Sequence, residues 1–244
     1  MATDLELAYG SRTVLAAATF HVPAGAVTAL IGPNGSGKST LLHALAGLLV
    51  PRHGRLDVPA ASLRGGVAYV LQATDVNEHL PLTVREAVTM GRYGRLGWLR
   101  RLQSEDRAAI DAALDAVAIS DLANRSLHEL SGGQRQRVFV AQGLAQEADV
   151  LLLDEPITGV DLVSRRYILD AIAAQRAAGR AVVVSTHDLG DASAADHVLL
   201  LAGRVVASGA PAEVLTDDHL ADAYGGHLLR LGGRTLILDD HPHH

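Results

Sequence analysis

Short apolar runs recur along the chain and predict the strands of a largely buried sheet. They are rich in aliphatic residues, and polar or turn-forming residues follow each of them. Strands that are covered on both faces read as uninterrupted apolar runs rather than as alternating patterns. The expected strands lie at residues 26–31, 55–58, 67–71, 150–153, 181–185, 198–201, 205–207 and 235–238.

Other segments show helical spacing. Between residues 110 and 117, aliphatic positions repeat at i, i+3, i+4 and i+7, which is typical of an amphipathic helix. Thr83 and Ser104 stand where N-caps are expected. Residues 91–97 are rich in glycine and arginine and predict a loop. Further helices are expected at residues 41–49, 135–146 and 161–178, with a short one near Leu220.

The N-terminal residues 3–22 alternate loosely and break at Tyr9, Gly10 and Ser11, which predicts a β-hairpin. Tyr9 would then lie at the exposed end of the hairpin. Its ring could stack on a purine base, and ordinary packing explains the pattern equally well.

A glycine-rich segment joins the first buried strand to the helix at 41–49 and fits the pattern G-x-x-x-x-G-K-[ST]. A strand, a glycine loop and a helix in this order aim backbone N–H groups and a helix N-terminus at an anion, so the segment predicts a phosphate-binding loop. The residues of this loop are Gly32, Pro33, Asn34, Gly35, Ser36, Gly37, Lys38, Ser39 and Thr40.

Each residue type in the loop has a chemical reason. The glycines let the backbone pass close to phosphate groups. Lys38 would reach the β- and γ-phosphates of a nucleotide, and the Ser39 hydroxyl would bind Mg²⁺. Lys38 is the only lysine in the chain, since the other long cationic side chains are arginines. A simple glycine turn before a surface lysine would not account for the flanking strand and helix.

Composition narrows the class of protein. The 244 residues suffice for one large domain, and 48% of them are hydrophobic. A net charge of −6 gives no support for nucleic acid as a partner, and the absence of cysteine excludes disulfides and thiolate metal sites. We expect neither a signal peptide nor a membrane span, and hence a cytoplasmic location.

Polar residues follow three of the predicted strands, at the edge where open α/β sheets bind ligands. Asp154 and Glu155 end the run at 150–153, as in phosphate-loop ATPases whose aspartate holds Mg²⁺. Glu155 could then act as a general base on water. Gln72 and His187 follow the runs at 67–71 and 181–185. Taken singly, each of these would be an ordinary polar loop residue.

The segment at 131–134 opens a predicted helix. Ser131 and Gln134 have the spacing of a capping box. Gly132 and Gly133 in a first turn each cost about 1 kcal/mol relative to alanine. A function that needs bare backbone N–H groups, such as anion binding, would account for that cost.

Together these motifs resemble those of the ATPase subunits of ATP-binding cassette (ABC) transporters, over essentially the whole chain. The most specific of them is Leu130-Ser131-Gly132-Gly133-Gln134, placed between a phosphate loop and the strand that ends in Asp154 and Glu155. The resemblance implies an α/β fold of the phosphate-loop NTPase type with a mixed sheet. Residues 1–72 and 136–244 would form the nucleotide-binding core, with an N-terminal antiparallel β subdomain, and residues 73–135 an inserted helical subdomain.

The resemblance also implies roles for individual residues. Tyr9 would stack on adenine, Gln72 would bind Mg²⁺ beside Ser39 and Asp154, and His187 would assist Glu155 and Lys38 in catalysis. ATP would lie between two subunits arranged head to tail. Asp161 would cross the interface, and the signature residues would contact the nucleotide of the partner subunit; these are Ser131, Gly132, Gly133 and Gln134.

Shorter segments resemble the zinc and manganese importers within this family. These are residues 81–86, 90–93, 97–98 and 158–161, where Thr158-Gly159-Val160-Asp161 replaces the more common Ser-Ala-Leu-Asp. The resemblance implies a membrane permease and an extracytoplasmic solute-binding protein as partners, and a place on the cytoplasmic side of the cell membrane. Two alternatives remain, namely an importer of another cargo such as an iron chelate, and a soluble ABC ATPase.

The C-terminal residues 239–244 contain three histidines and two aspartates. Histidine is a common metal ligand, but a terminal segment broken by proline is more often disordered. We therefore assign no role to this tail.

Overall fold

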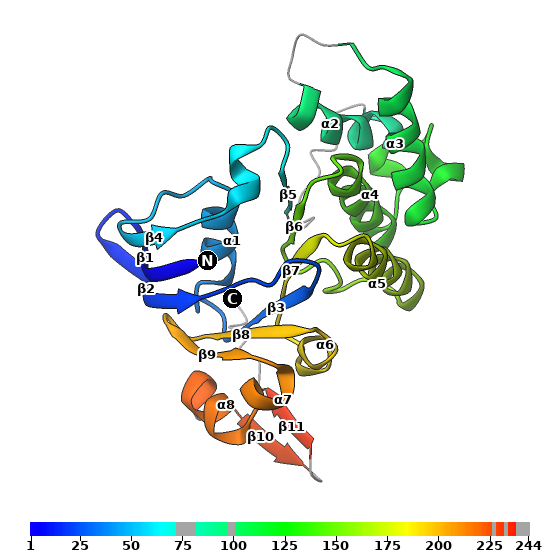
Figure 1. Cartoon of the computed structure of the whole chain (residues 1–244). Coiled ribbons are helices and arrows are strands. Elements are labelled where there is room, and N and C mark those ends of the chain that lie inside the picture. Colours follow the sequence, from blue (N-terminus) through cyan, green and yellow to red (C-terminus); the bar gives the residue numbers. More distant parts are fainter. Residues whose placement is uncertain (72–81, 97–100, 226–227, 232–233, 238–244) are drawn as a thin grey trace.

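The protein is described by a computed structural model, which covers residues 1–71, 82–96, 101–225, 228–231 and 234–237. Its centre is a six-stranded sheet in the order β5-β6-β7-β3-β8-β9 (Figure 1). The first five of these strands are parallel, and β9 pairs with β8 in the antiparallel sense. The strands are β3 Val27–Ile31, β5 Val67–Val70, β6 Val150–Leu153, β7 Ala181–Thr186, β8 His197–Leu201 and β9 Val205–Gly209.

Two smaller sheets complete the strands. An antiparallel sheet in the order β2-β1-β4 consists of β1 Ala2–Tyr9, β2 Arg12–Phe20 and β4 His53–Leu56. The predicted N-terminal hairpin is thus confirmed, with its turn at Gly10. Near the C-terminus, β10 Leu228–Leu231 pairs with β11 Arg234–Ile237.

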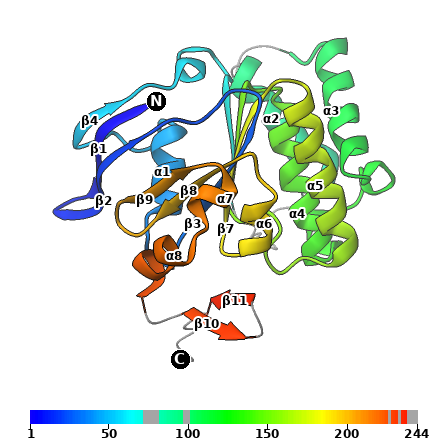
Figure 2. The ribbon, with the colours of Figure 1, turned by 60° about the horizontal axis from the view of Figure 1, so that its bottom comes forward.

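Helices cover both faces of the central sheet. The apolar residues of α1 pack with the β1–β2 hairpin and with Leu152 and Val183, whereas α4 and α5 pack against Leu153 and Val182 from the opposite face. Figure 2 shows α1 on one side of the strands and α4 and α5 on the other. The α-helices are α1 Lys38–Leu45, α2 Val84–Leu96, α3 Ser104–Ala116, α4 Gly132–Ala145, α5 Leu162–Ala177, α6 Leu189–Ser193, α7 Pro211–Val214 and α8 Asp217–Tyr224. Short 3₁₀ helices lie at η1 Pro59–Ser62, η2 Ser120–Leu122 and η3 Leu127–Glu129. Within the described residues, no helix is both long and apolar enough to cross a bilayer.

The prediction of a loop at residues 91–97 is wrong. This segment belongs to α2 as far as Leu96. Gly91 lies against α4, where a Cβ atom would stand 2.0 Å from the carbonyl oxygen of Gln142. The glycine therefore allows two helices to approach closely and does not end one of them.

Other boundaries differ by a few residues. The N-cap of α3 is Gln103 rather than Ser104. Helix α1 begins at Lys38, earlier than predicted, and also ends earlier. Strand β4 begins and ends two residues before the predicted strand. The division between helical subdomain and core remains a prediction. Its expected boundary at residue 135 lies inside α4.

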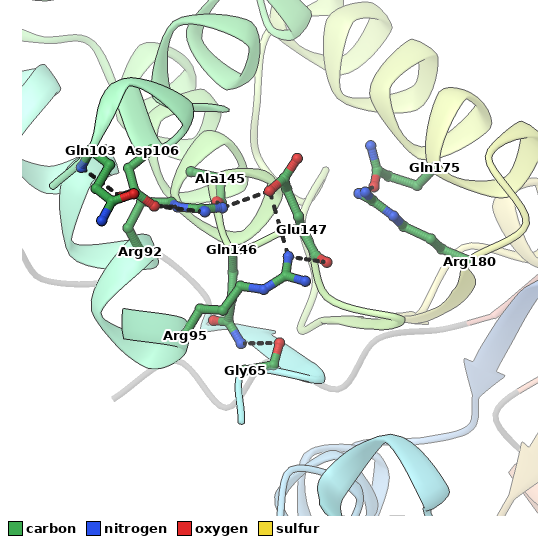
Figure 3. A network of polar contacts seen from close by, with 10 residues as sticks. All are labelled: Gly65, Arg92, Arg95, Gln103, Asp106, Ala145, Gln146, Glu147, Gln175 and Arg180. Carbon is green, nitrogen blue, oxygen red and sulfur yellow. Dashed lines mark hydrogen bonds and ion pairs between the residues drawn. The ribbon is translucent and has the colours of Figure 1, made fainter. Parts of the chain in front are cut away.

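A buried arginine ties three helices together (Figure 3). The guanidinium of Arg92 on α2 donates to Asp106 on α3 at 2.8 and 2.9 Å, and to the Ala145 carbonyl and the Glu147 carboxylate at 2.8 Å each. Beside it, the Gln146 side chain donates to the carbonyl oxygens of Gly65 and Val67, at the start of β5. The end of α4 is thereby tied to α2, to α3 and to the central sheet.

The contact at Gly91 predicts a strong effect of a single methyl group. We expect Gly91→Ala to lower the free energy of unfolding by about 1–3 kcal/mol, because the new Cβ collides with backbone that cannot move freely. Urea denaturation of the purified chain measures this. Gly94→Ala, one turn further along α2, is the control, because its Cβ would stand 3.3 Å from the Gln146 side chain and would need a much smaller displacement than the 2.0 Å approach at Gly91. Equal stability of the two variants would contradict the close packing of α2 on α4.

Candidate active site

The phosphate-loop segment connects β3 to α1, and its first glycine is required by packing. Gly32 has φ of +157°, and a Cβ atom there would stand 2.0 Å from the carbonyl oxygen of Leu201 at the end of β8. Gly37 precedes α1 with φ of +104°, which also favours glycine. The loop is thus held between the ends of β3 and β8 and leads directly into the N-terminus of α1.

Lys38 lies within this loop. Its side chain is buried, and Nζ donates to the carbonyl oxygens of Gly32 at 2.7 Å and Pro33 at 3.2 Å. The Ser36 N–H donates to the Pro33 carbonyl at 3.1 Å and closes the turn. The ammonium group is thereby held at the loop, where a phosphate would need it.

The remaining loop residues differ in exposure. Asn34, Gly35 and Ser39 are exposed, whereas Thr40 is buried. Ser39 is therefore exposed at the first turn of α1, as a metal ligand at this position would have to be.

Two acids end β6, separated by β7 from the strand that leads into the loop. The Ser185 hydroxyl on β7 donates to Asp154 Oδ1 at 2.5 Å and accepts from the Glu155 N–H at 2.9 Å. Neighbouring strands lie about 4.8 Å apart, so the ends of β3 and β6 lie about 10 Å apart. Both acids therefore stand at the same sheet edge as the phosphate loop.

Glu155 has φ of +45°, a left-handed conformation that is uncommon for residues other than glycine. Such conformations cluster at functional sites and persist only where the surroundings enforce them. His187 follows β7, and its Nδ1 atom lies 3.7 Å from Glu155 Oε2. The structure thus places the histidine beside the glutamate, as its predicted catalytic role requires.

Asp154 offers ligand chemistry that suits Mg²⁺. Its carboxylate is buried, and it also accepts a hydrogen bond from the Tyr69 hydroxyl, at 3.2 Å from Oδ2. Mg²⁺ prefers one or two carboxylate oxygens together with phosphate oxygens and water. Asp154 and Ser39 fit such a shell, whereas Gln72, the third predicted ligand, lies outside the described residues.

Tyr9 lies at the end of β1 and is 49% exposed. Its hydroxyl forms a hydrogen bond of 2.9 Å with Nδ1 of His43 on α1. The ring is thus anchored to the helix that begins at the phosphate loop, with part of its surface open to a ligand.

The signature segment begins α4 with the expected capping box. Ser131 N–H donates to the Gln134 side chain at 3.0 Å, and Gln134 N–H donates to the Ser131 hydroxyl at 3.3 Å. Packing requires a glycine at residue 133, because a Cβ atom there would stand 2.2 Å from Asp161 Oδ2. Sequence reasoning missed this contact. Gly132, by contrast, has open space around its Cβ position.

Asp161 caps α5. It accepts from the N–H of Ser164 at 2.9 Å and from the Ser164 hydroxyl at 2.8 Å, and the backbone hydrogen bond leads in holding the pKa of Asp161 below its usual range. The side chains of Leu162 and Val163, directly after it, are 85% and 61% exposed. This corner of the molecule therefore presents a charged cap beside an apolar surface.

The structure divides the predicted site residues into two groups. The phosphate loop, Asp154, Glu155 and His187 share one edge of the sheet. The signature residues and Asp161 start helices α4 and α5, which lie on the face opposite α1. Sequence reasoning missed Ser185, Tyr69 and His43. The signal for Ser185 was a hydroxyl inside an aliphatic run, and that for Tyr69 was an aromatic ring in a chain with few of them.

ATP-binding proteins of metal transport systems are similar to this chain over most of its length. The chain is 41% identical to the zinc transport system ATP-binding protein TroB of Treponema pallidum over 92% of its length and 86% of that protein. It is 40% identical to the manganese transport system ATP-binding protein MntA of Synechocystis, over 88% of its length and 85% of that protein.

Solved structures agree with these sequence relationships. A chain of a metal-chelate type ABC transporter in an inward-facing conformation superposes with a TM-score of 0.81 at 27% identity. The alignment covers 96% of this protein and 94% of that chain. The ABC transporter family itself matches residues 15–158, from β2 to the turn after Glu155. The protein therefore belongs to the ABC transporter family, as an ATP-binding subunit that couples ATP hydrolysis to transport.

Proposed function

We propose that this ATPase powers an importer of divalent metal ions, with zinc or manganese as cargo. The observation that carries the proposal is the identity of about 40% to zinc and manganese transport ATPases over nearly the whole chain. The phosphate loop, the paired acids and the signature helix supply the chemistry of ATP hydrolysis that import requires.

In the proposed site, backbone N–H groups of the loop and Lys38 bind the phosphates. Ser39 and Asp154 hold Mg²⁺, together with Gln72. The metal ion, when bound, neutralises charge on the phosphate oxygens. Glu155 accepts a proton from the attacking water, and His187 orients the glutamate and the γ-phosphate. Tyr9 stacks on the adenine ring.

The division of the site between two faces supports the proposal of a head-to-tail homodimer. Because α1 and α4 lie on opposite faces of the sheet, one chain offers its phosphate loop and its signature segment in different directions. A second chain could bring Ser131 to Gly133 against the nucleotide. The exposed Leu162 and Val163, next to Asp161, support an interface at this corner.

A separate membrane permease is the proposed partner of α2, on the cytoplasmic side of the membrane. Met90 and Tyr93 on this helix are 45% and 42% exposed. Methionine and aromatic residues are enriched in protein interfaces, so these two side chains support a contact at α2. An extracytoplasmic solute-binding protein would deliver the metal to the permease.

A cargo of chelated metal is the second candidate. The specific observation in its favour is the TM-score of 0.81 with a chain of a metal-chelate type transporter. The ATPase chemistry is the same in both cases, so the two proposals differ only in what the permease carries.

Lys38 tests the nucleotide site. We expect Lys38→Ala to lower ATPase turnover of the purified chain by at least about 100-fold, because a preorganised charge at the phosphates is lost. Arg107→Ala, which removes an exposed cation on α3, is the control and should hydrolyse ATP normally. Near-normal turnover in Lys38→Ala would refute the phosphate-loop assignment.

Glu155 tests both the proposed base and the dimer. We expect Glu155→Gln to bind ATP, to lose hydrolysis by about 10²–10⁴-fold, and to accumulate as a dimer in ATP. Light scattering after size-exclusion chromatography measures the mass. Glu105→Gln on α3, an exposed site, should turn over normally and not accumulate as a dimer. A Glu155→Gln chain that binds ATP yet stays monomeric would contradict the head-to-tail arrangement.

The cargo is tested in the cells that produce the protein. We expect cells that carry Glu155→Gln in place of the wild-type chain to lose zinc or manganese selectively under metal limitation, because transport stops without hydrolysis. Elemental mass spectrometry of washed cells measures this, with Glu105→Gln as the control. A loss confined to iron would favour the chelate importer, and unchanged metal content would overturn metal import while leaving the ATPase assignment intact.

A further inference from the structure

A chain of side-chain contacts connects the proposed adenine contact to the proposed Mg²⁺ ligand. The Tyr9 hydroxyl bonds to His43 Nδ1 at 2.9 Å. The His43 ring meets the Tyr69 ring edge-on, with 5.6 Å between ring centroids. The Tyr69 hydroxyl in turn donates to Asp154 Oδ2 at 3.2 Å. Tyr9, His43 and Tyr69 belong to β1, α1 and β5, and Asp154 directly follows β6, so these contacts link the antiparallel β1–β2 region to the central sheet.

Among these four residues, Tyr69 is the one that bonds directly to Asp154. Ser185 donates to Oδ1 of the carboxylate, and Tyr69 donates to Oδ2. With one donor on each oxygen, the plane of the carboxylate is fixed by two different strands. A phenol is protonated near neutral pH, so Tyr69 is available as a donor to the carboxylate.

We propose that Tyr69 is a positioning residue for Mg²⁺–ATP, which orients Asp154 through its hydroxyl and is itself held in place by His43. Outer-shell donors of this kind orient a ligating carboxylate, and their loss typically lowers metal affinity about 10–100-fold. The inference rests on the proposed role of Asp154 as a Mg²⁺ ligand. It adds a residue whose ring and hydroxyl have separate functions.

The position of Tyr69 in the sequence also relates it to Gln72. The residue lies on β5, three positions before Gln72, the predicted metal ligand that follows this strand. The hydroxyl adds a side-chain tie between β5 and the acid that follows β6, beside the backbone pairing of the two strands. Loss of the hydroxyl should therefore affect metal binding more than nucleotide binding.

Tyr69→Phe separates the hydroxyl from the ring. Mn²⁺ serves as a paramagnetic probe for the Mg²⁺ site, and its free concentration is read by electron paramagnetic resonance in the presence of a non-hydrolysable ATP analogue. We expect the dissociation constant for Mn²⁺ to rise about tenfold in Tyr69→Phe. Binding of a fluorescent ATP analogue in EDTA should remain as in the wild type, because the phosphate loop is intact.

Tyr167→Phe is the matched control. Its ring, rather than its hydroxyl, contacts Arg137, at 5.4 Å from the ring centroid, and the change should leave Mn²⁺ affinity unaltered. His43 provides a graded test of the ring contact. His43→Phe keeps an aromatic edge against Tyr69 and should retain most of the Mn²⁺ affinity, whereas His43→Ala should lose affinity as Tyr69→Phe does.

The outcomes separate this inference from the function on which it rests. Wild-type affinity for Mn²⁺ in Tyr69→Phe, with a large loss in Asp154→Asn, would overturn the role of Tyr69 and keep the metal site. Unchanged affinity in Asp154→Asn would overturn the metal site itself. An equal loss of Mn²⁺ and metal-free nucleotide binding in Tyr69→Phe would show a general structural effect and would also overturn the inference.

Discussion

The contact between Gly32 and the end of β8 is the constraint on which the site depends. The space for a side chain at residue 32 is filled by the Leu201 carbonyl, so the chain must leave β3 in one direction. The turn after β8 then supports the loop, since Gly203 N–H donates to the Ser36 carbonyl at 3.1 Å and its own carbonyl accepts from Ala16 N–H at 2.9 Å. Backbone groups from three segments thus set the loop before any ligand arrives, which reduces the entropy that binding must overcome.

The two faces of the sheet carry different parts of the proposed site. On one face, α1 and the β1–β2 hairpin bring together the groups that would meet base and phosphates. On the other, α4 and α5 start at the signature serine and at Asp161, and the Arg92 network ties α4 to α2 and α3. Movement of α2 by a partner would therefore be transmitted to α4 through buried charge-assisted hydrogen bonds, which are stronger than neutral ones.

Sequence reasoning succeeded where a local pattern and its structural cause coincide. The strands of the central sheet, the loop between β3 and α1, the capping box at Ser131 and the helix at 161–178 follow from apolar runs and from side chains that bond to backbone nearby. It failed where the reason for a residue is a contact with a distant part of the chain. Gly91 indicated a loop locally but fits against α4, and Gly133 accommodates Asp161. Contacts of this kind leave no periodic trace in the sequence, so only the folded structure could give their reason.

The arrangement at the ends of β6 and β7 shows how little freedom the two acids have. A hydroxyl group has one proton to donate, and Ser185 directs it to Asp154. The lone pairs of the same oxygen accept the Glu155 N–H, which holds this residue in its left-handed conformation. Rotation of the Ser185 side chain would release both contacts at once. The proposed metal ligand and the proposed general base therefore share one hydrogen-bonding side chain on the neighbouring strand, and that strand also leads to His187. Because β7 lies between β3 and β6, it is the strand through which the two acids are positioned relative to the phosphate loop.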